Sequence, residues 1–100
     1  MTDLTIAEVP HPNAVVKHRY SRYFAPDGSR WIRHGLFLSY HEDGSLASEG
    51  NDEHGAEVGL WKDFHPNGQI AAEGLYVNGA QAPGWRYWTD DGREEDAPRI

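Results

Sequence analysis

Histidine is the residue type in this chain with the clearest capacity for chemistry, because imidazole binds zinc and moves protons near neutral pH. His41 and His65 hold equivalent places in a repeat described below, which would set them two strands apart, about 9–10 Å. One zinc ion needs both nitrogens about 2.0–2.1 Å away, and there is no cysteine to complete a ligand set. We therefore expect no metal and no other cofactor, and interpret the histidines as structural or turn-capping residues. The six are His11, His18, His34, His41, His54 and His65.

Paired carboxylates are the second candidate chemistry. Glu49 and Glu73 would be separated by the same distance, close to the roughly 6.5–9.5 Å of inverting glycosidases, but duplication of a repeat explains both. A loose cation site at Asp52 and Glu53 is less favoured than a solvated loop. No Ser-His-Asp arrangement, phosphate loop, dinucleotide fingerprint or EF-hand pattern is present. The sequence thus predicts a protein that is not an enzyme.

The composition fits one small domain of 100 residues with a formal net charge of −7. Leu, Ile, Val and Phe account for only 18 residues, so the core must depend on the 12% of residues that are aromatic. The lack of cysteine excludes a disulfide framework and a thiol nucleophile. No apolar run approaches the ~20 residues of a membrane helix, and the first residues do not resemble a signal peptide. We expect a cytoplasmic protein.

A 24-residue repeat organises the chain, since Asp43-Gly44, Asn67-Gly68 and Asp91-Gly92 recur at that interval. Such dipeptides favour the positive φ of tight hairpin turns. The pattern predicts an all-β fold, an array of consecutive antiparallel β-hairpins in a single elongated twisted sheet. We expect strands near 16–24, 29–34, 36–40, 45–50, 60–64, 69–76 and 85–89. The structural repeat residues are Phe37, Tyr40, Gly44, Trp61, Phe64, Gly68, Trp85 and Gly92.

Because 24 is even, repeat-equivalent residues should share one face of the sheet. Two aromatic columns are therefore expected to form the core, with Leu46 and Ile70 as aliphatic filler. One column is Phe37, Trp61 and Trp85, and the other is Tyr40, Phe64 and Trp88.

The repeats also predict the domain boundaries. Residues 1–14 are expected as an N-terminal arm, 15–97 as the repeat domain and 98–100 as a tail. The units are placed at about 16–34, 35–58, 59–83 and 84–97. The first unit is taken as shortened, because Gly28 precedes Gly44 by only 16 residues. The polar end of the last unit, Arg93–Asp96, is interpreted as a cap.

These units resemble the MORN-repeat variant family, in particular its short bacterial antitoxin-like members. The resemblance is carried by Gly35-Leu36-Phe37, Gly59-Leu60-Trp61 and Gly84-Trp85, each followed by a second aromatic and an Asn/Asp-Gly pair. It covers residues 35–92 well and 23–34 partly. It implies a hairpin-repeat scaffold and an antitoxin-like role. The short first unit and the acidic connection at 51–54 depart from the pattern.

Charge is unevenly spread, with a local net of +4 over residues 17–33 and −6 over 41–57. One interpretation is a solvated surface on which the two blocks neutralise each other. The other is an acidic surface that steers a basic partner, such as a toxin domain. The candidate partner-binding residues are Glu42, Asp43, Asp52, Glu53 and Glu57, with Tyr76 and Trp88 as aromatic anchors.

The resulting hypothesis is a non-catalytic protein-binding module, an antitoxin or immunity-type protein that neutralises its partner by occlusion. It rests mainly on the resemblance. A structural or scaffold repeat module is the alternative from another class, followed by an acidic nucleic-acid mimic and a carbohydrate- or lipid-surface binder. We expect no membrane and no direct nucleic-acid binding, and the sequence leaves the oligomeric state open.

Overall fold

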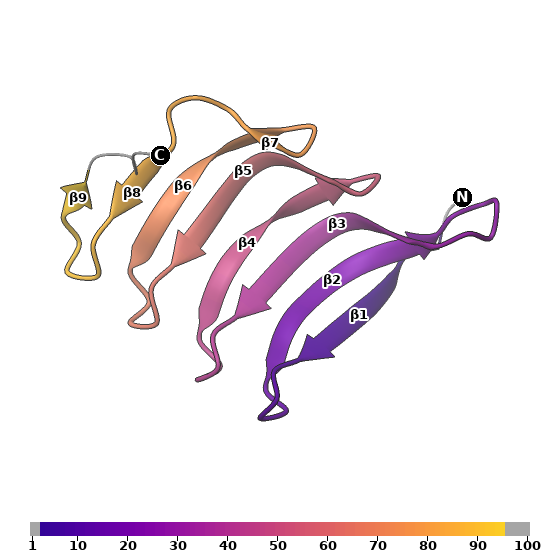
Figure 1. Cartoon of the computed structure of the whole chain (residues 1–100), viewed down its shortest axis with the longest axis horizontal. Coiled ribbons are helices and arrows are strands. Elements are labelled where there is room, and N and C mark those ends of the chain that lie inside the picture. Colours follow the sequence, from indigo (N-terminus) through magenta and orange to yellow (C-terminus); the bar gives the residue numbers. More distant parts are fainter. Residues whose placement is uncertain (1–2, 96–100) are drawn as a thin grey trace.

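The computed structural model describes residues 3–95, which form one nine-stranded antiparallel sheet (Figure 1). The strands run in the order β1-β2-β3-β4-β5-β6-β8-β9, and β7 pairs with β6 beside this path. From β1 to β6 each strand therefore pairs with its neighbours in the chain, as consecutive hairpins require, and the predicted all-β fold is confirmed. The strands are β1 (Thr5–Pro10), β2 (Val16–Phe24), β3 (Trp31–Tyr40), β4 (Leu46–Glu53), β5 (Ala56–Phe64), β6 (Ile70–Val77), β7 (Ala80–Gln81), β8 (Arg86–Trp88) and β9 (Glu94–Glu95).

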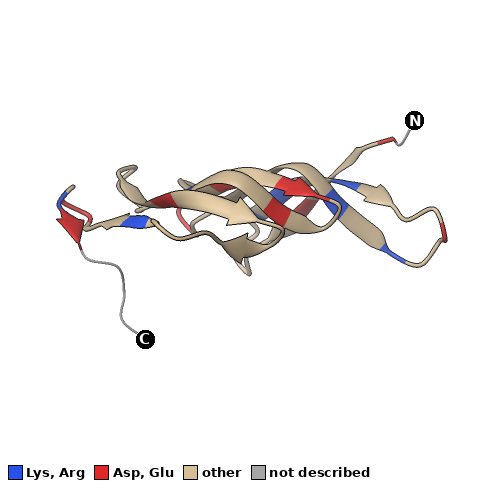
Figure 2. Cartoon of the chain, turned by 90° about the horizontal axis from the view of Figure 1, so that it is seen from above, with Lys and Arg blue, Asp and Glu red and all other residues tan. Residues whose placement is uncertain are grey.

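The sheet is a single twisted layer with extents of 46 × 34 × 23 Å, seen from above in Figure 2. Within residues 3–95 nothing is packed over either face as a second layer. In the same range no helix is long and apolar enough to cross a membrane. Within the described residues, each face of the sheet is therefore covered by its own side chains alone.

The two faces differ in character. The aromatic face carries Tyr20, Phe37, Trp61, Tyr76, Trp85 and Tyr87, placed by the pairings Tyr20↔Phe37, Trp61↔Gly74 and Ala72↔Tyr87 and by side-chain alternation. The leucine face carries Leu36, Leu60 and Leu75 beside a row of charged residues. It is placed by the pairings Leu60↔Leu75 and Lys62↔Glu73.

A repeated bulge precedes each leucine and aromatic pair on β3 and β5. Gly35 and Gly59 adopt φ values of 99° and 70° where these strands carry extra residues opposite their neighbours. A positive φ is inexpensive for glycine, and beyond the bulge successive side chains alternate between the two faces as in any strand. The leucine therefore points to one face and the aromatic residue to the other.

The predicted core column is confirmed in part. Phe37 and Trp61 are buried and their ring centroids lie 5.6 Å apart. Trp61 and Trp85, however, are joined through Tyr76, whose ring lies 5.6 Å from the first and 5.3 Å from the second. Tyr76 can reach between them because the neighbouring residue on β6 in this row, Gly74, has no side chain.

The second predicted column is wrong as a stack of rings. Tyr40, Phe64 and Trp88 are half-buried, but no ring contact joins them within the described part of the chain. Tyr40 and Phe64 instead pair in register with Leu46 and Ile70, the residues expected as filler. Aliphatic neighbours thus separate these aromatics.

The N-terminal segment differs from the predicted arm, because Thr5–Pro10 pairs with β2 as an edge strand. The turn that joins the two strands is His11–Ala14, and Ala14 holds the positive φ of 73° that glycine holds in later copies. The first unit is therefore the β1–β2 hairpin. The turn at 25–28 lies at the other end of the strands from the turn at 11–14 (Figure 1). Residues 16–34 are therefore not a shortened copy of the repeat. Residues 1–2 and 96–100, including the ends of the predicted arm, last unit and tail, lie outside the described residues.

Candidate functional site

Histidines link successive hairpins at one end of the strands, along the row of turns that we call the histidine edge. The Nε2 atoms of His11, His41 and His65 each donate a hydrogen bond of 2.8 Å, to the backbone carbonyls of Tyr40, Phe64 and Trp88 respectively. Since a carbonyl can only accept, Nε2 carries the proton in all three rings. The interpretation of the histidines as structural residues is thus confirmed for these three, which bond to the next hairpin rather than cap their own turn. Each histidine opens a four-residue turn, and His41 and His65 are 24 residues apart, so the repeat marks them as equivalent but does not reveal their partners.

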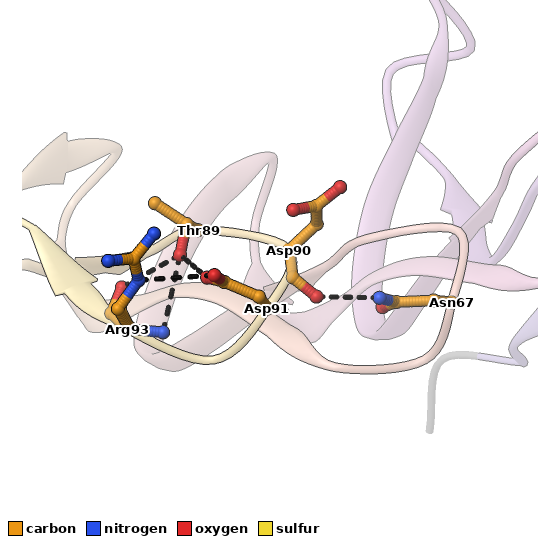
Figure 3. Close-up of polar contacts among 5 residues, drawn as sticks. All are labelled: Asn67, Thr89, Asp90, Asp91 and Arg93. Carbon is orange, nitrogen blue, oxygen red and sulfur yellow. Dashed lines mark hydrogen bonds and ion pairs between the residues drawn. The ribbon is translucent and has the colours of Figure 1, made fainter.

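Asparagine side chains strengthen the same edge. The Nδ2 atom of Asn13 donates to the carbonyl of Glu42 at 3.1 Å, and that of Asn67 donates to the carbonyl of Asp90 at 2.7 Å (Figure 3). The last turn begins with Thr89 in place of histidine. Its hydroxyl bonds to Asp91 and to the backbone of Arg93 within the same turn (Figure 3). The side chains of this edge therefore hold successive hairpins together, whereas Thr89 of the last turn bonds within its own turn.

A second histidine cluster lies at the opposite edge, beside a cavity of about 370 Å³ that Leu4 and Pro26 also line. Tyr23 and His54 share a hydrogen bond of 2.7 Å, and the backbone N–H of His54 donates to Nδ1 of His34 at 3.1 Å. Nδ1 of His34 accepts, so in the neutral ring the proton sits on Nε2, which cannot then bind a metal. Residues 3–95 contain no group of three side chains that could hold a metal ion.

The predicted acidic surface is divided between the two edges of the sheet. Glu42 and Asp43 lie in the β3–β4 turn, where Ser45 hydrogen bonds lower the pKa of Asp43. Glu53 and Glu57 flank the β4–β5 turn at the other end of β4. The eight residues of β4 span roughly 26 Å. These carboxylates therefore do not form one patch.

Asp52 does not fit its predicted role as a contact residue, because its side chain is only 1% exposed. It lies on the aromatic face, 3.7 Å from Nε of Arg33, and neither of its carboxylate oxygens has a hydrogen-bond partner in the described structure. Burial raises the pKa of this carboxyl above its ordinary value, against the opposing effect of Arg33. Asp52 is therefore a buried residue whose negative charge is unfavourable in the folded state.

Among the described residues one ion pair joins the two charge blocks. Arg33 of the basic block pairs with Asp52 of the acidic block, whereas Arg19 pairs with Glu8, outside the acidic block, at 2.6 Å. Figure 2 shows acidic and basic segments intermixed along the sheet. The large sequence blocks thus do not become two opposed charged surfaces.

A continuous row of rings crosses the aromatic face from β2 to β8. The ring centroids are separated by 5.7 Å for Tyr20–Phe37, 5.6 Å for Phe37–Trp61, 5.6 Å for Trp61–Tyr76, 5.3 Å for Tyr76–Trp85 and 6.5 Å for Trp85–Tyr87. Phe37 and Trp61 are buried at its centre, and the other four are half-buried. The row is therefore both core and accessible surface.

The two tryptophans of this row are fixed by equivalent hydrogen bonds. Nε1 of Trp61 donates to the carbonyl of Asn51 at 3.1 Å, and Nε1 of Trp85 donates to that of Leu75 at 3.0 Å. Asn51 and Leu75 are themselves 24 residues apart. The rings are thus held in place by the repeat.

Of the predicted partner-binding residues, the structure brings Tyr76 and Glu57 together. The pairing Asp52↔Glu57 puts Glu57 on the aromatic face. Burial raises the pKa of the Tyr76 hydroxyl, and the Glu57 carboxylate adds to that rise. Trp88 lies on the leucine face instead, with the guanidinium of Arg86 4.9 Å from its ring.

The two glutamates considered as a catalytic pair also lie on the leucine face. Lys62 stands between them in the sheet, paired with Glu49 on one side and Glu73 on the other. Both carboxylates belong to a row of charged residues across the strands. The arrangement is that of a cross-strand ion ladder.

The comparisons with known proteins agree with this architecture. The MORN repeat variant family matches residues 33–51 and 57–78, which correspond to the β3–β4 and β5–β6 hairpins. No curated protein and no solved structure matches the chain significantly. MORN repeats are generally non-catalytic modules, often in protein-binding or scaffold roles. Two hairpins that are similar to MORN-variant repeats therefore form the middle of the sheet.

Proposed function

We propose that the protein is a non-catalytic module that binds a protein partner on its aromatic face. The observation that carries this proposal is the row of six rings across a sheet that has no second layer within residues 3–95. Trp and Tyr dominate the binding energy of protein interfaces. The half-buried rings at both ends of the row are the contact surface.

Pre-organisation favours binding here. The rings of Tyr76 and Trp85 already touch each other, and the Trp85 indole is hydrogen-bonded to the backbone. Little side-chain entropy is then lost when a partner docks. Glu57 beside Tyr76 is the acidic residue placed to attract a basic partner to this face.

We propose further that binding neutralises the partner by occlusion, as in an antitoxin or immunity protein acting in the cytoplasm. Support comes from the resemblance of the repeats to antitoxin-like proteins of this family. A scaffold role is the alternative. Mimicry of nucleic acid is less favoured, because the acidic residues are divided between two edges.

The test is capture of the partner from the native host with the tagged protein, followed by binding kinetics. Tyr76→Ala should speed dissociation at least tenfold, because it removes an anchor. Glu57→Lys should slow association most at low salt. Ile6→Ser, at an exposed residue on the leucine side of β1, is the control and should leave both rates unchanged.

A growth assay then separates neutralisation from scaffolding. Cells that produce the captured partner should grow only when the wild-type protein is present, and Tyr76→Ala should protect them less. Partner binding without protection supports the scaffold role. A partner whose kinetics ignore Tyr76→Ala but respond to Ile6→Ser would contradict binding on the aromatic face.

A further inference from the structure

The leucine face exposes apolar side chains in its middle. Leu36, Leu60 and Leu75 are 50%, 52% and 54% exposed. A shallow cavity of about 250 Å³ lies between the first two, with Asn51, Glu49 and Lys62 in its lining. Adjacent exposed leucines around a depression are typical of an interface rather than of a solvated sheet surface.

Strand pairing and the shared cavity bring these leucines together across the strands, although the bulge in β5 pairs Asn51 with Val58. Leu36 pairs with Asn51, and Leu60 pairs with Leu75. The neighbouring row begins with Leu38 on β3 and is charged from β4 onward, where Glu49 pairs with Lys62, Lys62 with Glu73 and Glu73 with Arg86. Opposite charges thus alternate along β4, β5, β6 and β8, with Glu49 and Lys62 on the two central strands.

This pattern is self-complementary about a twofold axis that runs parallel to the strands, between β4 and β5. Such an axis lays β4 of one copy over β5 of the other, and β3 over β6. Glu49 then faces Lys62 of the second copy, and Leu36 faces Leu75 of the second copy. Leu60 of the second copy lies over Asn51, at the cavity between Leu36 and Leu60. We propose that the occupant of the leucine face is a second copy of this chain, packed face to face.

The face is large enough for this. With long axes of 46 and 34 Å, about half of one face supplies the roughly 800 Å² per partner of a stable interface. Twisted sheets pack face to face with their strands about 30° apart, so contact concentrates at the centre. The outer arginines, Arg19 and Arg86, lie away from that centre and keep their own glutamate partners.

The proposed dimer is independent of the partner binding proposed for the aromatic face. It buries the leucine face of each copy and leaves both aromatic faces pointing outward. One assembly would then carry two identical partner sites, which raises avidity for a multivalent partner.

Sedimentation velocity over a range of concentrations tests the dimer. The full chain should sediment at about twice its 11.3 kDa. Leu60→Ser should raise the dimer Kd at least tenfold, because it removes the side chain that enters the cavity. Val9→Ser, at an exposed residue on the aromatic side of β1, is the matched control and should leave the Kd unchanged.

A charge swap makes the test independent of the leucine variant. Lys62→Glu should dissociate the dimer, since the introduced carboxylate would face Glu49 of the second copy, and adding Glu49→Lys should restore it. Circular dichroism verifies that each variant keeps its sheet. Wild-type protein that sediments as a folded monomer at every concentration would overturn the proposal. So would a dimer that survives both Leu60→Ser and Lys62→Glu.

Discussion

Two glycines, Gly50 and Gly74, determine how the aromatic rings pack, because they have no side chain. A Cβ atom on Gly50 would lie 2.1 Å from Cδ2 of Trp61, and one on Gly74 would lie 2.4 Å from the ring of Trp85. Neither glycine has a positive φ, so close approach and not backbone conformation requires glycine there. The 24-residue spacing revealed that these glycines are equivalent. Their purpose could not be predicted, because it depends on a ring on the next strand.

This contact predicts strong coupling between Gly50 and Trp61. Gly50→Ala should destabilise the fold by roughly 1–3 kcal/mol through overpacking, and Trp61→Ala by roughly 3–5 kcal/mol through loss of a buried ring. Since the clash disappears when the ring is gone, the double variant should cost clearly less than the sum. Urea unfolding measures all three. Gly50→Ala combined with Trp85→Ala, which touches Gly74 instead, is the additive control, and equal coupling in both pairs would contradict the contact.

Asp52 predicts a pH dependence of the unfolding free energy. Burial raises its pKa in the folded state above the ordinary 3.8, so the folded state holds the proton more tightly than the unfolded state does. The contribution of Asp52 is therefore favourable below the unfolded pKa and is lost as pH rises through the folded pKa. Asp52→Asn removes that loss, and its stability relative to wild type should increase as pH rises from about 4 to 7. A difference that stays constant or falls over this range would show that Arg33 compensates the buried charge. Asp43→Asn, at an exposed turn with a lowered pKa, should show the opposite slope at lower pH, since the contribution of Asp43 is present above its unfolded pKa of 3.8 and is lost as pH falls through the folded pKa.

One four-residue turn recurs along the histidine edge. In each copy the fourth residue donates its N–H to the carbonyl of the first, and it has a positive φ. Asp-Gly and Asn-Gly pairs were sufficient to predict three of these turns and the strands around them. The first was missed because Ala14 stands where the other copies have glycine. The bonds that tie one turn to the next were missed because they join residues 23 or 29 positions apart.

Ala14 therefore predicts a stabilising substitution. Its φ of 73° is strained for alanine and relaxed for glycine. Ala14→Gly should raise the unfolding free energy by about 1 kcal/mol, less the entropy that glycine adds to the unfolded chain. Gly44→Ala, at the same place in the next turn, should lower it by a similar amount. Thermal unfolding of both variants is the measurement, and a destabilised Ala14→Gly would mean that the turn has another conformation.

At the scale of the whole molecule, the sheet is a one-dimensional array in which each hairpin contacts only its neighbours. Repeat spacing predicted this order of strands, since equivalent residues must stack at a constant offset. It did not predict that the acidic block would divide between two edges, because that depends on where along the block β4 begins and ends. Nor did it predict that Tyr76 would join the rings of Trp61 and Trp85, because that contact depends on the packing across β5, β6 and β8.

A one-dimensional array should lose its backbone protection from the ends inward. The strands β3 to β6 have eight to ten residues and a paired strand on each side, whereas β8 and β9 have three and two residues. Stability then varies along the chain as a sum of hairpin and interface contributions. Hydrogen exchange followed residue by residue should show the slowest amides in β4 and β5 and the fastest in β8 and β9. Trp61→Ala, at the centre of the aromatic row, should lower protection throughout β3–β6, whereas Trp88→Ala should affect the C-terminal strands alone. Uniform protection from β1 to β9, lost everywhere at once in both variants, would instead show that the sheet unfolds as one cooperative unit.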